Sequence, residues 1–168
     1  MKNPNEPDDE RVRHKARASG AGMLSRRPLS KSTLIEKLTE KGYAAPLAQE
    51  TAEWLESIGA LDDAQYAELL AQRYRARGYG QYRIQNELKR HGIDSETAAQ
   101  ALGQLPESDD AIDRFIRSRL KGEKPDRMQL KRLSDALFRK GFGWDEIREA
   151  IDRYMNTEET DEWPKGLD

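Results

Sequence analysis

The residues best suited to chemistry in this sequence are basic and aromatic side chains gathered in one short segment. Between positions 73 and 91 the only acid is Glu87. The cationic residues there are Arg73, Arg75, Arg77, Arg83, Lys89 and Arg90. The aromatic ones are Tyr74, Tyr79 and Tyr82. Such cations could contact a phosphate backbone, and such rings could stack on bases or on a partner's side chains. The segment equally fits a solvated helix face with half-buried tyrosines, so both interpretations stay open.

Gly78 and Gly80 raise the question of a phosphate-binding loop. Such a loop needs either a Gly-Lys pair after four intervening residues or a third glycine at position 83, which is arginine here. A helical pattern, not a strand, also precedes Gly78. The sequence therefore favours Gly78 as the end of one helix and Gly80 as the cap of the next.

Residues typical of catalysis or metal binding are sparse. The sequence has no cysteine, and its two histidines are His14 and His91, fewer than a convergent metal site needs. Asp62 and Asp63 could form an acid–base pair, but adjacent residues at a helix start point in different directions, and helix capping explains them. We predict no catalytic residue, no metal and no cofactor, and hence a protein that is not an enzyme.

Composition limits the remaining possibilities. The 168 residues are 36% charged and 36% hydrophobic, a lean supply for one thick core, and the net charge of −2 does not by itself indicate a nucleic-acid binder. Without cysteine, a secretory apolar stretch or a membrane-length apolar run, we expect a cytoplasmic protein.

Helices must position these residues, because apolar positions recur at helical spacing and no alternating strand pattern is present. We predict helices over residues 31–41, 46–58, 64–77, 81–91, 95–102, 109–121, 126–140 and 144–154. Aspartates stand where helix starts need caps, at Asp62, Asp63 and Asp94. Glycines stand where helices end in the left-handed conformation, at Gly42, Gly78, Gly92 and Gly141.

An internal repeat is also visible. The segments 38–43, 88–93 and 137–142 share a leucine, a basic residue or histidine, a glycine and then an apolar residue, at separations of 50 and 49 residues. Each unit carries a third helix between these turns. We therefore predict an all-α fold, an elongated tandem array of three three-helix repeats.

The domain organisation follows from this repeat. We predict a disordered arm of mixed charge over residues 1–26 and a solvated acidic tail over 156–168. Between them lie a partial first repeat over 27–61, a second over 62–105 and a third over 106–155.

The middle repeat resembles the signature of the RecX family of bacterial recombinase regulators. The resemblance lies in Leu61-Asp-Asp-Ala-Gln-Tyr-Ala67, Gly78-Tyr-Gly80 and the stretch from Arg83 to Ile93. It extends over about residues 26–154, with the outer repeats less specific than the middle one.

The resemblance implies a monomeric, non-enzymatic protein that binds the RecA recombinase filament. It would lie in the filament groove near the DNA, lower ATP hydrolysis and strand exchange, and so act on homologous recombination and the SOS response. The residues leave a second function open, a stand-alone module that binds single- or double-stranded DNA through the basic middle repeat.

Overall fold

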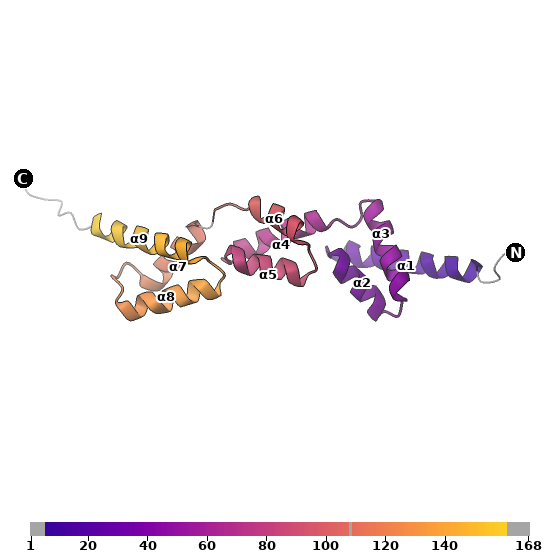
Figure 1. The fold of residues 1–168 in the computed structure, drawn as a ribbon, viewed down its shortest axis with the longest axis horizontal. Helices are drawn as coiled ribbons and strands as arrows, with labels where there is room; N and C mark the ends of the chain where they lie inside the picture. The colour runs from indigo at the N-terminus through magenta and orange to yellow at the C-terminus, as the bar shows by residue number, and fades with distance from the viewer. Residues whose placement is uncertain (1–5, 108, 161–168) are drawn as a thin grey trace, which may run out of the picture. The chain divides into compact units, whose positions relative to one another are not determined.

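The computed structural model describes residues 6–107 and 109–160, and within them every regular element is an α-helix (Figure 1). The helices are α1 Glu6–Arg26, α2 Lys31–Glu40, α3 Ala45–Ser57, α4 Asp63–Ala76, α5 Gln81–Arg90, α6 Ser95–Gly103, α7 Asp109–Leu120, α8 Arg127–Arg139 and α9 Trp144–Thr160. The predicted all-α fold is confirmed. No helix in this part of the chain is both long and apolar enough to cross a membrane.

The eight predicted helices agree with the structure to within one residue at every end but the last. The helix end predicted at residue 154 is wrong, because α9 continues to Thr160. Asn156 and Thr157, which belong to the predicted solvated tail, are exposed in this helix. The apolar spacing that predicted this helix stops near Met155, so the sequence pattern gave no signal for its last residues. The rest of the predicted tail, 161–168, lies outside the described residues.

The N-terminal prediction is also wrong for residues 6–26, which form α1 and pack against α2 and α3. Small residues make this contact. Ala16 is fully buried, and a Cβ placed on Gly20 would lie 2.8 Å from Leu55 Cδ1. A helix that packs through alanine and glycine shows little apolar periodicity, so its pattern resembled that of a disordered arm. The first repeat is therefore not partial, because α1 supplies its third helix.

Polar contacts add to the packing of α1. Arg13 Nε lies 3.3 Å from Glu50 Oε1, and Arg17 Nη2 lies 3.8 Å from the same oxygen. The Arg17 guanidinium also lies 4.6 Å from the centre of the Trp54 ring. These partly exposed pairs contribute modestly to stability, and they fix which side of α1 faces α3.

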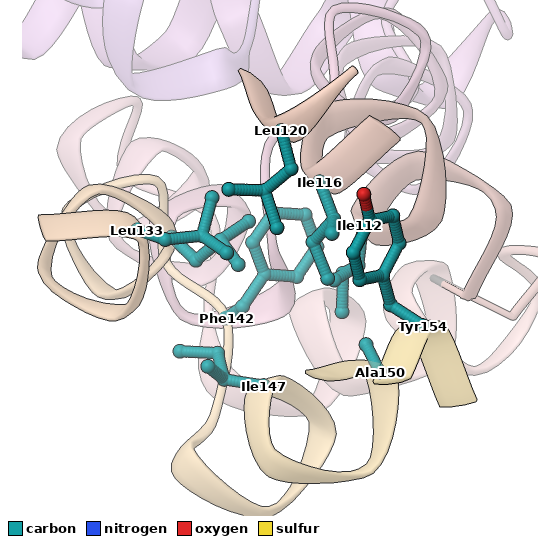
Figure 2. Close-up of a cluster of buried hydrophobic side chains, with 9 residues drawn as sticks. Ile112, Ile116, Leu120, Leu133, Phe142, Ile147, Ala150 and Tyr154 are labelled. Carbon is teal, nitrogen blue, oxygen red and sulfur yellow. The ribbon is translucent and has the colours of Figure 1, made fainter. Parts of the chain in front are cut away.

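The described residues form two compact units, one of residues 6–70 and 87–103, the other of residues 71–86, 104–107 and 109–160. The predicted second repeat thus contributes to both. In the first unit, α1, α2 and α3 enclose a buried cluster of Leu29, Leu34, Leu38, Ala48, Ala52, Leu55 and Leu61. In the second unit, α7, α8 and α9 enclose a cluster with the Phe142 ring at its centre, among Ile116, Leu133 and Ile147 (Figure 2).

The three glycine turns share one hydrogen-bond pattern. The residue after the glycine donates its N–H to a leucine carbonyl five residues back, in the pairs Tyr43–Leu38 (3.1 Å), Ile93–Leu88 (3.1 Å) and Phe142–Leu137 (3.3 Å). The left-handed conformation predicted at these glycines, and at Gly78, is confirmed by φ values of +101° at Gly42, +77° at Gly78, +72° at Gly92 and +91° at Gly141. This is the Schellman arrangement, which satisfies carbonyls at a helix end.

Asp94 caps α6 as predicted, since its Oδ1 accepts the Thr97 N–H at 2.9 Å and its Oδ2 accepts the Thr97 hydroxyl at 2.7 Å. The backbone N–H bond, followed by the hydroxyl bond, lowers the pKa of Asp94 below its ordinary value of 3.8. An acid with a lowered folded-state pKa stabilises the fold above its unfolded pKa, and this contribution is lost as pH falls through the lower folded value.

We therefore expect Asp94→Asn to reduce the loss of stability that the wild type shows on acidification below about pH 4. Urea midpoints of both proteins between about pH 6 and pH 2 measure this difference. Parallel pH profiles would contradict the assignment of the cap.

Candidate binding surface

The basic segment is held in place by a junction between the start of α5 and the end of α8. The Gly80 N–H donates to the Lys140 carbonyl at 2.8 Å, and the Tyr82 N–H donates to the Gly141 carbonyl at 3.1 Å. N–H groups at the start of α5 and carbonyls at the end of α8, which have no partner within their own helices, hydrogen-bond to each other here. A Cβ on Gly80 would overlap the Gly141 carbonyl, and a Cβ on Gly141 would overlap the backbone of Arg83. This close approach fixes the position of the Arg83 backbone against the turn at Gly141.

The same kind of junction occurs 50 residues earlier, between the start of α2 and the end of α5. The buried Ser30 hydroxyl donates to the His91 carbonyl at 2.6 Å and accepts the Thr33 N–H at 3.2 Å. The Lys31 N–H donates to Asp63 Oδ1 at 2.7 Å. Each junction lies within one compact unit. Both use the glycine turn of one repeat to close the helix start of the preceding repeat.

Three of the predicted cations, Arg73, Arg77 and Arg83, are exposed and belong to the second compact unit. The Arg83 guanidinium lies 5.8 Å from the centre of the Tyr79 ring. Lys89 and Arg90 are exposed and belong to the first unit, where Arg90 Nη1 lies 3.4 Å from Glu87 Oε1.

Arg75 differs from its neighbours because its side chain is partly buried. Its Nη1 lies 3.4 Å from the Tyr79 carbonyl, while its Nε is buried without a hydrogen-bond partner. Burial lowers the pKa of Arg75, and the nearby Glu146 carboxylate opposes this shift. An arginine in this setting packs against the fold more than it faces solvent.

The predicted stacking tyrosines also fall into two environments. Tyr74 and Tyr79 are half-buried and contact each other, with ring centres 5.5 Å apart and a tilt of 48°. Lys140 Nζ lies 5.1 Å from the Tyr79 ring centre. Tyr82 is 60% exposed, so it is the one of the three whose ring is broadly open to solvent.

The two adjacent aspartates act on different helices. Asp62 Oδ1 accepts the Gln65 N–H at 3.0 Å and so caps α4. Asp63 accepts the Lys31 N–H at the start of α2, a long-range contact that sequence reasoning missed. Burial raises the pKa of Asp63, and the hydrogen bond from Lys31 opposes this. The two carboxylates thus have separate hydrogen-bond partners in the fold.

His91, the histidine at the end of α5, lies beside an aromatic hydroxyl. Its Nδ1 is 3.1 Å from the Tyr66 hydroxyl, and the two ring centres are 5.7 Å apart. Among the described residues, no cluster of three or more His, Asp or Glu side chains is placed to hold a metal ion.

Sequence reasoning also missed an aromatic groove in the second unit. Phe138 and Trp144 stack with ring centres 4.8 Å apart and planes at 19°, although they are 50% and 52% exposed. They border a groove of about 470 Å³, whose other lining residues are Tyr82, Arg83, Asn86, Arg139, Gly141, Phe142 and Gly143. The available signal was the density of aromatic residues around the last glycine turn.

Comparison with known proteins shows which family the chain resembles. The family profile described as "RecX, second three-helix domain" matches residues 62–102. The Regulatory protein RecX of Trichlorobacter lovleyi is 34% identical over 138 residues, which cover 78% of this chain and 90% of that relative. The chain belongs to the RecX family. The RecX of Stenotrophomonas maltophilia strain R551-3 is 36% identical over 132 residues, covering 77% of this chain and 80% of the relative.

Solved RecX structures have the same fold. The crystal structure of RecX from Lactobacillus salivarius matches with a TM-score of 0.79 at 19% sequence identity, covering 86% of this chain and 97% of that one. A second structure, of a regulatory protein RecX, also matches with a TM-score of 0.79 and covers 90% of this chain. The resemblance to the RecX family seen in the sequence is confirmed.

Proposed function

We propose that this RecX-family chain is a non-enzymatic regulator that binds the RecA recombinase filament in the cytoplasm as a monomer. It lowers the filament's ATP hydrolysis and strand exchange, and through them recombination and the SOS response. The observation that carries the proposal is the identity to curated regulatory RecX proteins over most of the chain.

The exposed arginines support a contact with the filament. Arg73, Arg77 and Arg83 present guanidinium groups to solvent on one compact unit. A recombinase filament carries both DNA phosphates and acidic side chains, and arginine binds either kind of anion through paired N–H donors. The glycine-turn junction at Gly80 sets the start of the helix that carries Arg83.

A second candidate function is a stand-alone DNA-binding module, which the same three exposed arginines favour. Co-sedimentation separates the two. We expect the chain to pellet with recombinase assembled on single-stranded DNA more strongly than it binds the same DNA alone or unassembled recombinase. Equal binding to naked DNA and to the assembled filament would favour the DNA-binding module and contradict the filament regulator.

A further inference from the structure

The exposed aromatic pair Phe138 and Trp144 is unusual because both rings lie half in solvent while stacked on each other. Phe138 is in the last turn of α8 and Trp144 opens α9, so the glycine turn at Gly141 brings them together. Neither belongs to the buried cluster of this unit. Their stacking therefore adds a flat apolar surface outside the core.

The groove beside this pair has the size and the charge of an anion-bearing ligand site. Its volume of about 470 Å³ falls within the range of about 300–1,000 Å³ found for small-ligand sites. Arg83 and Arg139 line it, and none of the described residues that line it is acidic. The Glu146 carboxylate lies nearby and accepts the Gly143 N–H at 2.7 Å.

The side chains that line the groove match the chemistry of a nucleotide, which combines an aromatic base with a phosphate. Aromatic rings stack on nucleobases of any sequence, guanidinium groups bind phosphates, and a side-chain amide such as that of Asn86 can pair with a base edge. Tyr82 adds a third exposed ring, since a Cβ on Gly143 would lie 3.5 Å from Tyr82 Cε2. A base that stacks must be unpaired, because duplex bases already stack on their neighbours.

We infer that this aromatic groove binds an unpaired base of a single-stranded nucleic acid. Trp144 and Phe138 provide the stacking surface, and Arg83 and Arg139 contact the phosphates on either side of the base. This goes beyond the proposed regulation of the recombinase, and it is tested without any recombinase present.

The test measures binding of the full chain to single-stranded oligomers of deoxythymidine or uridine and to an abasic strand of equal length. We expect Trp144→Ala and Phe138→Ala each to weaken binding to at least one base-bearing oligomer by about 10-fold. Met128→Ala is the matched control, because Met128 is 59% exposed on α8 outside the groove. It should bind like the wild type. Preference for deoxythymidine or uridine identifies the natural nucleic acid.

The abasic strand keeps the test independent of how the variants fold. The wild type should bind it about 10-fold more weakly than the base-bearing oligomer, whereas Trp144→Ala should bind the two about equally. Equal binding of the wild type to both strands would overturn the inference. So would a folded Trp144→Ala variant that binds the base-bearing oligomers as tightly as the wild type does, because the rings would then not stack on a base.

Discussion

Replacing Gly141 with alanine should destabilise the protein by about 3–5 kcal/mol, whereas the same change at Gly42 should cost only about 1 kcal/mol. Both glycines have positive φ, +91° and +101°, so alanine is strained at either position. The two positions differ in the room that they leave for a Cβ atom. A Cβ on Gly141 would overlap the backbone of Arg83, while a Cβ on Gly42 would meet no atom within 4 Å. Alanine at 141 must therefore push α5 away from α8.

Urea unfolding of the two variants measures this difference directly. The Gly141→Ala variant should also lose protection of the Gly80 amide against hydrogen exchange, because that N–H donates to the Lys140 carbonyl. Gly42→Ala should leave it protected. Equal destabilisation by the two changes would mean that the backbones of α5 and the α8 turn do not approach as closely as the junction requires.

Changing Arg73, Arg77 and Arg83 together to glutamate should weaken binding to the DNA-bearing filament by about 100-fold. If the arginines contact phosphates, the dependence of log affinity on log salt should also flatten by about two to three, because each lost contact removes roughly one released counterion. All three side chains are exposed, so the free energy of unfolding should change little.

A matched control variant distinguishes the loss of these three arginines from the change in net charge. Arg11, Arg26 and Arg27 are also exposed, and changing them to glutamate alters the charge of the chain equally. This second triple variant should bind the filament much more tightly than the first. If the arginines face acidic side chains of the recombinase instead, an acid-to-base change on the recombinase should restore binding. Wild-type affinity of the first variant at every salt concentration would show that these arginines form only a solvated face.

Local signals made most of the fold predictable. Helix ends at Gly42, Gly92 and Gly141 depend on a backbone conformation that glycine adopts readily, and the caps at Asp62 and Asp94 depend on residues three positions away. The helix α1 was missed because it packs through Ala16 and Gly20, which leave no apolar stripe in the sequence.

Contacts between distant residues account for what the sequence could not predict. Ser30 bonds to His91 across 61 positions, and Lys31 bonds to Asp63 across 32. Arg75 and Arg77 read alike in sequence, yet one is partly buried and the other is exposed. The groove at Trp144 likewise forms only when the start of α5 meets the turn between α8 and α9.

Regulation of the recombinase should be visible in its rate of ATP hydrolysis. The measurement is the steady-state ATPase rate of RecA on single-stranded DNA as the chain is added from far below to equal molar amounts. We predict that the rate falls steeply while the chain is still substoichiometric, and that the Arg73, Arg77 and Arg83 triple variant needs much more protein for the same effect. A rate that stays unchanged up to an equimolar amount of folded wild-type chain would show that the chain does not regulate the recombinase.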